Sequence, residues 1–394
     1  MTAGCAVAAH IEERLLARNR LFERFFDREA PPLAAACREM SERFLRGGRL
    51  LAFGRGACAT DAQHVAVEFV HPVIVGKRAL PALDLSPLFG PWLEANLGPD
   101  DMVMGFGPPG GDPEVHAALR AAAARGALTF ALPGREGGYA VEPETDDPFA
   151  HQELLEILYH TLWETVHVFF EHRELGHEVG QAGFLYPFLG RDKQQAPDLL
   201  GEVAGSIRMK VADDAALRAR VAAEEADAIA AAARLIAGRV RRGGQLILFG
   251  NGGSATDAND WAIDCVAPPA GLRPVPAVSL AFEPATLSAI ANDIGPEVLF
   301  LRQLIAHARS GDVAVAISTS GGSRNVIAAL EEARRRRLAT VALLGYDGGE
   351  VLRRGLADVA VVVRSDYIPR IQEVQASIYH LIREQMEVGD GDPV

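Results

Sequence analysis

The order of hydrophobic and polar positions along the chain predicts one succession of helices and strands that occurs twice. In the first half, apolar residues recur at helical spacing over 11–26 and 31–46, and a short apolar run, RLLAFG, follows at 49–54. In the second half, a helical pattern over 221–242 leads into the run QLILFG at 245–250. Each run ends in glycine before another helical segment. A buried strand that leads into a glycine-rich turn and a helix is typical of a doubly wound α/β sheet.

Further short apolar runs between helical patterns indicate more strands in both halves. They are predicted at 81–86, 100–106 and 127–133 in the first half, and at 274–280, 312–318, 339–345 and 359–365 in the second. The segment 173–205 is rich in glycine and proline and lacks clear periodicity, so it is predicted to be a linker. The expected fold is therefore α/β, with two tandem domains at 1–172 and 206–394. Each should be a doubly wound, mostly parallel sheet flanked by helices.

Length and composition agree with two well-cored globular domains. The chain has 394 residues, of which 49% are hydrophobic and 23% are charged. The formal net charge of −13 argues against nucleic acid as a partner, because phosphate backbones attract basic surfaces. Four cysteines without CxxC spacing are typical of a reduced, cytoplasmic protein. No apolar run reaches the length of a membrane span, and the first residues do not resemble a signal peptide.

The two halves share a stretch that indicates a duplication. Residues 54–72 read GRGACATDAQHVAVEFVHP and residues 250–268 read GNGGSATDANDWAIDCVAP, which are identical at nine of nineteen positions. The copies differ at chemically important places. The first has a histidine and a glutamate where the second has two aspartates, and the second has an asparagine and a serine where the first has Arg55 and Cys58.

A serine-rich loop in the second half predicts a phosphate-binding site. The run ISTSGGSRNVIAAL joins the strand at 312–318 to a helix that begins near Arg324. Hydroxyls and backbone N–H groups at a helix N-terminus form a neutral cradle suited to a phosphate monoester. A Ser/Gly turn that only caps the helix is the alternative, and the companion loop GNGGSATD at 250–257 makes it less favoured. The candidate residues are Ser318, Thr319, Ser320 and Ser323.

The matching loop of the first half lacks this chemistry. Aligning 106–115 with 317–326 places Gly107, Pro109 and Asp112 where the second half has serines. A proline has no N–H to donate, and an aspartate repels phosphate. This copy is therefore predicted to have lost phosphate binding.

Two residue pairs in the first half predict a metal or acid–base site. His64 and Glu68 are four residues apart in one predicted helix, and Gln152 and His160 are eight apart in another, so each pair lies on one helix face. Two imidazoles, a carboxylate and an amide oxygen suit a catalytic zinc or a similar divalent ion, and they also supply a general base and acid. A single histidine in an apolar helix is more often a core residue. Here, however, the Gln-x7-His spacing recurs near the end of the second half.

These motifs resemble those of the sugar isomerase (SIS) domain family, and in particular the phosphoheptose isomerases, which act on sedoheptulose 7-phosphate. The second half carries FGNGGSATDA, AIANDIG, ISTSGGSRNVIAAL and RIQEVQASIYH, and the first half carries DAQHVAVEF and QELLEILYH. The resemblance implies metal ligands at His64, Glu68, Gln152 and His160, with Glu68 and His160 also catalytic. It implies phosphate or substrate binding at Asn251, Ser254, Asn292, Asp293, Ser318, Thr319, Ser320 and Ser323.

The resemblance also bears on how a working site is assembled. Family members are usually single-domain homotetramers with active sites at subunit interfaces. One half of this chain keeps the metal and acid–base set and the other keeps the phosphate set, so one composite site is expected, within a chain or across a homodimer that forms a pseudo-tetramer of SIS domains. In the second half Asp260 and Asp264 replace the His/Glu pair, so the second site, with Gln372 and His380, is predicted to be degenerate.

The expected function is the isomerisation of sedoheptulose 7-phosphate to a heptose (manno-heptose) 7-phosphate. Glu68 would remove the proton alpha to the carbonyl, His160 would act on the oxygen, and a divalent metal, expected to be zinc, would stabilise the enediolate. The alternative is a non-catalytic SIS protein that senses a sugar phosphate or serves as a scaffold, which the altered second-half pair supports. A third possibility, a hexose phosphate isomerase or aminotransferase-like enzyme, is disfavoured because we find no glutaminase region.

Overall fold

The computed structural model describes residues 3–74, 77–174 and 199–387. Their contacts divide the chain into two units. The N-terminal unit is Arg20–Ala215, and the C-terminal unit combines Ala216–Val394 with Met1–Asn19. Most of the predicted linker lies outside the described residues, and its last part, 199–205, forms the start of a long helix.

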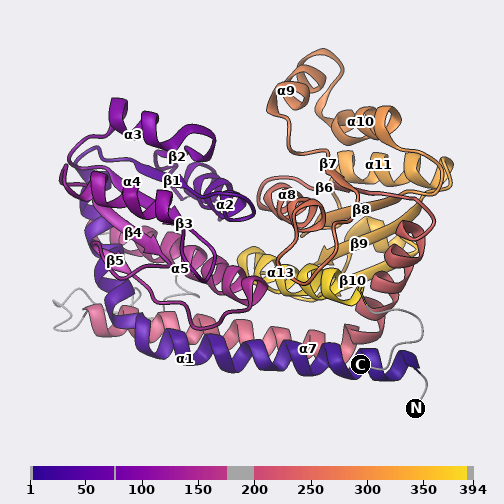
Figure 1. The fold of residues 1–394 in the computed structure, drawn as a ribbon, viewed down its shortest axis with the longest axis horizontal. Coiled ribbons are helices and arrows are strands. Elements are labelled where there is room, and N and C mark those ends of the chain that lie inside the picture. The colour runs from indigo at the N-terminus through magenta and orange to yellow at the C-terminus, as the bar shows by residue number, and fades with distance from the viewer. Residues whose placement is uncertain (1–2, 75–76, 175–198, 388–394) are drawn as a thin grey trace. The chain divides into compact units, whose positions relative to one another are not determined.

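The N-terminal unit is built around a five-stranded sheet in which every pairing is parallel (Figure 1). The strand order is β2-β1-β3-β4-β5. Its elements, with the helix that precedes them, are α1 (Ala3–Leu45), β1 (Leu50–Phe53), α2 (Cys58–Val70), β2 (Ala82–Asp84), η1 (Ser86–Leu88), α3 (Phe89–Asn96), β3 (Met102–Phe106), α4 (Pro113–Ala123), β4 (Leu128–Leu132), β5 (Tyr139–Ala140) and α5 (Pro148–Glu174).

The C-terminal unit repeats this plan with its own parallel sheet, in the order β10-β9-β8-β6-β7. Its elements are α7 (Leu199–Val240), β6 (Leu246–Phe249), α8 (Gly253–Val266), β7 (Ala277–Ser279), α9 (Pro284–Asp293), η3 (Pro296–Val298), α10 (Leu299–His307), β8 (Val313–Ser318), α11 (Arg324–Arg335), β9 (Ala339–Gly345), α12 (Gly349–Arg353), β10 (Val359–Val363) and α13 (Ile368–Gln385). The predicted α/β fold with two tandem parallel sheets is confirmed.

Both sheets have the same topology, and this topology fixes where a ligand can bind. Within each half the strands are arranged in the order second, first, third, fourth, fifth. In such a doubly wound sheet the chain changes direction between the first and third strands, and the loops that follow those strands leave a crevice at their carboxyl ends. In the C-terminal unit these are the loops after β6 and β8. In the N-terminal unit they are the loops after β1 and β3.

Each sheet is covered by hydrophobic side chains on both faces. Alternate residues of β1 belong to different clusters: Leu50 packs with α1, α2 and α5, whereas Leu51 packs with α3 and α4. In β6, Leu248 packs toward α8 and α13 and Ile247 toward α10 and α11. This two-sided burial explains why the strands read as continuous apolar runs in the sequence.

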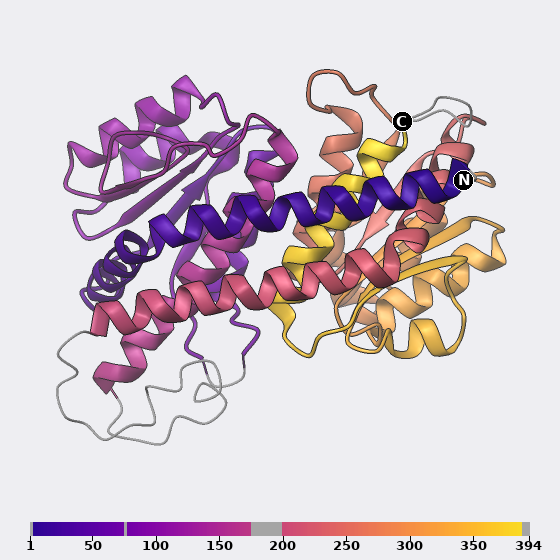
Figure 2. The ribbon, with the colours of Figure 1, turned by 90° about the horizontal axis from the view of Figure 1, so that it is seen from below.

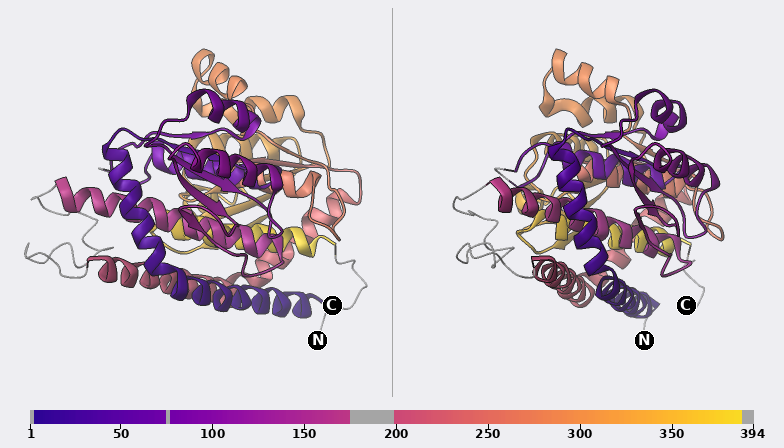
Figure 3. Two further views of the ribbon diagram at one scale, coloured as in Figure 1. Left: turned by 60° about the vertical axis from the view of Figure 1, so that its left-hand side comes forward. Right: turned by 90° about the vertical axis from the view of Figure 1, so that its left-hand side faces the viewer.

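The first two predicted helices form one continuous helix. Helix α1 runs through Pro31 and Pro32 without ending, and Figure 3 shows that it changes direction along its length. A proline inside a helix removes a hydrogen bond and favours a kink, so the sequence pattern favoured a break. The neighbouring Ala30, Leu33 and Ala34 are fully buried, and this packing holds the helix together across the prolines.

The starts of the long helices α1 and α7 belong to the opposite unit from the rest of each helix. Ile11 and Leu15 of α1 are fully buried in the core of the C-terminal unit, where the start of α1 lies beside α7 (Figure 2). Ile207 and Val211 of α7 are buried in the core of the N-terminal unit. Each unit therefore completes its core with a helix segment from the other half of the sequence.

Two further features bear on earlier expectations. Cys37, Cys58 and Cys265 are free thiols. Among the described residues, none of the helices combines the length and the apolar character that crossing a membrane would require.

The burial of the start of α1 in the core of the C-terminal unit leads to a prediction for Leu15. Leu15→Ala should destabilise the C-terminal unit by about 2–4 kcal/mol, because it leaves a cavity in that unit's core. Hydrogen exchange should show lost protection in β6 and β8, with β1 and β3 less affected. Glu13→Ala, an exposed change on the same helix, is the control. Loss of protection confined to β1 and β3 would contradict the assignment of this helix segment.

Candidate active site

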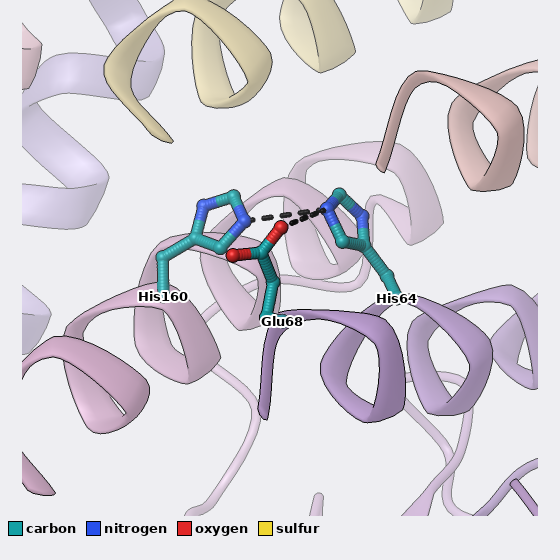
Figure 4. A group of neighbouring side chains, drawn as sticks. All are labelled: His64, Glu68 and His160. Atoms are coloured by element: carbon teal, nitrogen blue, oxygen red, sulfur yellow. Dashed lines mark hydrogen bonds and ion pairs between the residues drawn. The ribbon is translucent and has the colours of Figure 1, made fainter. Parts of the chain in front are cut away.

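Helices α2 and α5 bring three of the predicted residues together in the N-terminal unit. His64 and Glu68 lie one turn apart on α2, and His160 lies on α5. The two imidazole Nε2 atoms are 3.3 Å apart, and Nε2 of His64 is 3.9 Å from Oε1 of Glu68. Figure 4 shows the three side chains pointing toward one another. All three are at least 98% buried.

This cluster fits a divalent metal. Its three ligand atoms all lie within 4.8 Å of one another, and ligands about 2.1 Å from a tetrahedral ion lie roughly 3.4 Å apart. Oε2 of Glu68 is buried and has no hydrogen-bond partner in the described part of the chain. Burial raises the pKa of Glu68 to about 8, and the negative charge of Glu164 acts in the same direction. Such a carboxylate is stabilised in its ionised form by a bound cation.

Residues around the cluster anchor its two helices. Gln152 lies two turns before His160 on α5, and its Nε2 donates to Oγ1 of Thr60 (3.4 Å) and Oδ2 of Asp61 (3.2 Å) in the first turn of α2. Glu164, one turn after His160, forms a buried ion pair with Lys210 of α7. The sequence did not point to Lys210, because nothing in the local pattern distinguishes it from a surface lysine.

The C-terminal unit contains a different cluster at the matching place. Nε2 of His380 on α13 lies 3.4 Å from Oδ2 of Asp260 and 3.3 Å from Oδ2 of Asp264, both on α8. The hydroxyl of Tyr379 donates to Oδ2 of Asp260 (2.8 Å). Burial raises the pKa of Asp264 to about 6; the charge of Asp260 adds to this shift and His380 opposes it. Gln372 lies two turns before His380 and is also buried. The three ligand atoms of this cluster also lie within 4.8 Å of one another, so it is a second candidate metal site, with one imidazole and two carboxylates.

The predicted phosphate loop lies at the carboxyl end of β8 and leads into α11. Ser318 is buried at the end of the strand, and its Oγ accepts from the N–H of Gly321 (3.2 Å), while Oγ of Ser320 accepts from the N–H of Gly322 (3.2 Å). Thr319 lies between the two serines. Ser323 is the N-cap of α11 and makes no side-chain cap hydrogen bond. The helix N-terminus is therefore free of an anionic cap, as phosphate binding requires.

Close backbone contacts join this loop to the loop that contains Gly348 and Gly349. Gly321 has φ +57°, and a Cβ there would lie 2.2 Å from the carbonyl oxygen of Gly348. Gly349 has φ +55°, and a Cβ there would lie 2.2 Å from the carbonyl oxygen of Ser320. Only glycine satisfies both the left-handed backbone and the close approach, which explains the paired glycines of these two loops.

The loop after β6 supplies the second side of the crevice. Ser254, the second residue of α8, is buried, and Asn251 precedes the helix. The side-chain amides of Asn251 and Asn325, in the first turn of α11, donate to each other's Oδ1 at 3.0 and 2.9 Å. Asn325 was missed from the sequence, although it lies within the serine-loop motif. Asn292 and Asp293 are exposed at the end of α9, where Nδ2 of Asn292 donates to Oδ1 of Asp293 (2.8 Å).

The corresponding loops of the N-terminal unit carry charged side chains instead. Asp112, the N-cap of α4, accepts from the N–H groups of Glu114 and Val115, so a carboxylate of the protein occupies the helix N-terminus. Arg55, in the loop after β1, lies 2.8 Å from Oε1 of Glu114 and 3.4 Å from Oδ2 of Asp112. These two acidic residues engage the cation and leave a negative cap where phosphate would otherwise bind.

A family model and several known proteins match this chain. A family model described as "SIS domain" matches residues 211–345. The phosphoheptose isomerase of Geobacter sp. (strain M21) is 43% identical over 165 residues, which is 42% of this chain and 85% of that protein. The phosphoheptose isomerase of Thermodesulfovibrio yellowstonii is 37% identical over 187 residues, 47% of this chain and 92% of that protein.

A solved structure resembles the chain over nearly its whole length. The tagatose-6-phosphate ketose/aldose isomerase from Escherichia coli aligns with a TM-score of 0.55 at 15% sequence identity, covering 98% of this chain and 94% of that one. At this identity the likeness concerns the fold alone. The two phosphoheptose isomerase relatives, together with the duplicated parallel sheets and the serine loop, lead to one conclusion. This chain belongs to the SIS-domain family, as a tandem member related to the phosphoheptose isomerases.

Proposed function

We propose that this protein is a metal-dependent aldose–ketose isomerase that converts sedoheptulose 7-phosphate to a heptose (manno-heptose) 7-phosphate. The observation that carries the proposal is the complementary retention of chemistry in the two units. The N-terminal unit groups His64, Glu68 and His160 while its phosphate loop is capped by an aspartate. The C-terminal unit keeps the serine loop while carboxylates have replaced two positions of its metal set. Random decay would be expected to damage both functions in both halves.

The N-terminal cluster has the groups that an isomerase needs. Oε1 of Glu68 faces His64, and Oε2 has no hydrogen-bond partner in the described part of the chain, so Oε2 is the atom we assign to removing the proton alpha to the carbonyl. His160 moves the proton at the substrate oxygen, which carries the negative charge of the enediolate. A divalent ion held by His64, Glu68 and His160, with Gln152 from the family resemblance, would supply Lewis acidity at the carbonyl; zinc suits these nitrogen and oxygen ligands.

The C-terminal unit supplies binding energy rather than reacting groups. A phosphate held by Ser318, Thr319, Ser320 and Ser323 lies at the far end of the sugar from the carbonyl. Interactions with this non-reacting group orient the substrate and lower the barrier through positioning. We infer that one working site needs both units, either within one chain or across a homodimer that forms a pseudo-tetramer of SIS domains.

A non-catalytic role is the second candidate. Asp260 and Asp264 stand in place of the His/Glu pair in the His380 cluster, and a protein that lost catalysis in one half can lose it in the other. Such a protein would bind a sugar phosphate as a sensor or scaffold without turnover. Measured turnover of the sugar phosphate separates the two candidates.

Turnover should depend both on the His/Glu cluster of the N-terminal unit and on the serine loop of the C-terminal unit. With sedoheptulose 7-phosphate as substrate, His160→Ala and Ser320→Ala should each lower kcat/KM by at least about 100-fold, since one removes an acid–base group and the other a phosphate ligand. His380→Ala should lower it by less than about 10-fold. NMR detection of the aldose, with and without a chelator, provides the measurement. Absence of conversion by the metal-loaded wild-type protein would exclude the isomerase proposal, and an equal loss in His380→Ala would assign the live site to the other half.

Metal content should match a single site per chain. After dialysis against zinc, mass spectrometry of the metal should find one ion per chain, because among the described residues only the N-terminal cluster has two imidazoles facing a carboxylate. His64→Ala should remove most of it, whereas Asp264→Asn should leave it unchanged. Two ions per chain, or retention of the ion in His64→Ala, would show that the metal assignment is wrong.

The metal-free protein should lose stability as the pH rises, because of Glu68. Its folded pKa of about 8 exceeds the ordinary value of 4.5, so the folded state binds more protons, and the stability present below about pH 4.5 is lost as the pH rises through 8. Each pKa unit corresponds to roughly 1.4 kcal/mol, so the free energy of unfolding should fall by at most about 5 kcal/mol. Glu68→Gln should not show this loss. Melting temperatures of the wild type and Glu68→Gln, measured with a chelator from about pH 5 to 9, should diverge at high pH. Parallel curves would contradict the prediction. Added zinc should stabilise only the wild type.

A further inference from the structure

The amide pair of Asn251 and Asn325 joins the two loops that form the proposed phosphate site. Each side chain donates one hydrogen bond and accepts one, at 3.0 and 2.9 Å. Oδ1 of Asn325 also accepts from the N–H of Val326 (2.9 Å), which fixes the orientation of the amide on the first turn of α11. The pair is neutral, so it brings no charge of its own to the crevice.

The position of this pair follows from the sheet topology. Strands β6 and β8 are neighbours, and the chain changes direction between them. The loop after β6 leads into α8 and the loop after β8 leads into α11. The amide pair ties these two helix N-termini together at the crevice. A phosphate monoester is recognised by N–H and hydroxyl groups from such loops, and its affinity depends on their relative position.

The other half of the chain has a bridge at the same two positions. Arg55 corresponds to Asn251 in the duplication, and Glu114 corresponds to Asn325. Nη1 of Arg55 lies 2.8 Å from Oε1 of Glu114. Both units therefore link these two loops, but with different chemistry: a charged pair beside an aspartate cap in the N-terminal unit, and an uncharged pair beside Ser323 in the C-terminal unit.

We propose that Asn325 is a positioning residue for phosphate recognition: through Asn251, it holds the loop after β6 at the distance from the serine loop at which both bind one phosphate group. The inference rests on the proposed function for the identity of the sugar substrate, but not for phosphate binding itself. Asn325 acts through its partner, so its contribution requires that Asn251 be present. A residue with only a general structural role would have no such requirement.

The test is a pair of binding and kinetic measurements on the full chain. Isothermal titration with inorganic phosphate, and KM and kcat for sedoheptulose 7-phosphate, are measured for wild type, Asn325→Ala, Asn251→Ala and the double variant. Asn325→Ala should weaken phosphate binding and raise KM by about 10-fold, with kcat within about 3-fold. In the Asn251→Ala background the same change should alter phosphate affinity by less than about 2-fold, because the pair is already broken.

The control is Asn96→Ala, which removes an exposed amide hydrogen bond from Asn96 to Trp92 in the other unit and should leave every parameter unchanged. A phosphate affinity of Asn325→Ala within about 2-fold of wild type, or an equal loss in both backgrounds, would overturn the proposal. Melting temperatures of both single variants are compared with that of the wild type. Asn251→Ala breaks the same pair from the other loop, so a melting temperature lowered only in Asn325→Ala identifies a folding defect of that variant. If wild type binds phosphate but does not convert the sugar, the proposed function fails and the phosphate arm still decides the role of Asn325.

Discussion

A carboxylate buried in a protein interior must be neutralised or accompanied by a cation, and this constraint governs both clusters. In the N-terminal unit, Glu164 has Lys210 as its ion-pair partner, whereas Glu68 faces two imidazoles and has a raised pKa. In the C-terminal unit the exchange of the histidine for Asp260 adds a second carboxylate, and His380 lies between the two. The same helix positions thus hold two imidazoles and one carboxylate in the N-terminal unit, and one imidazole and two carboxylates in the C-terminal unit.

Most of the fold could be predicted from sequence because its signals are local. The strands are buried on both faces, so each reads as a short apolar run, and the first run of each half ends in a glycine-rich turn. The pairing of His64 with Glu68 also follows from helical spacing. That His160 meets them does not follow from spacing; it was inferred from the recurrence of the Gln-x7-His pattern and the family resemblance. The structure places three of these four residues together and sets Gln152 against the start of α2.

The remaining features depend on contacts between segments that are distant in sequence. Pro31 and Pro32 predict a helix break, but tertiary packing outweighs the local preference. Lys210 resembles any surface lysine until the fold places it beside Glu164. Asn325 could have been predicted from the duplication. Asn251 and Asn325 are both neutral, whereas the matching residues of the first half, Arg55 and Glu114, have opposite charges. Such complementary changes between internal copies are a signal of contact that single-residue motifs do not carry.

The reciprocal packing of the starts of α1 and α7 gives each half a reason to be retained that is independent of its chemistry. If either half were deleted, the other would lose a helix segment from its core, with Ile11 and Leu15 or Ile207 and Val211 removed from their burial sites. Selection for a folded chain is therefore enough to preserve the second copy of the sheet. With the scaffold kept for stability, substitutions at the ligand positions of one copy and the phosphate loop of the other could accumulate separately. Structural dependence between duplicated halves is in this way a route by which both copies can be retained while their functional residues diverge.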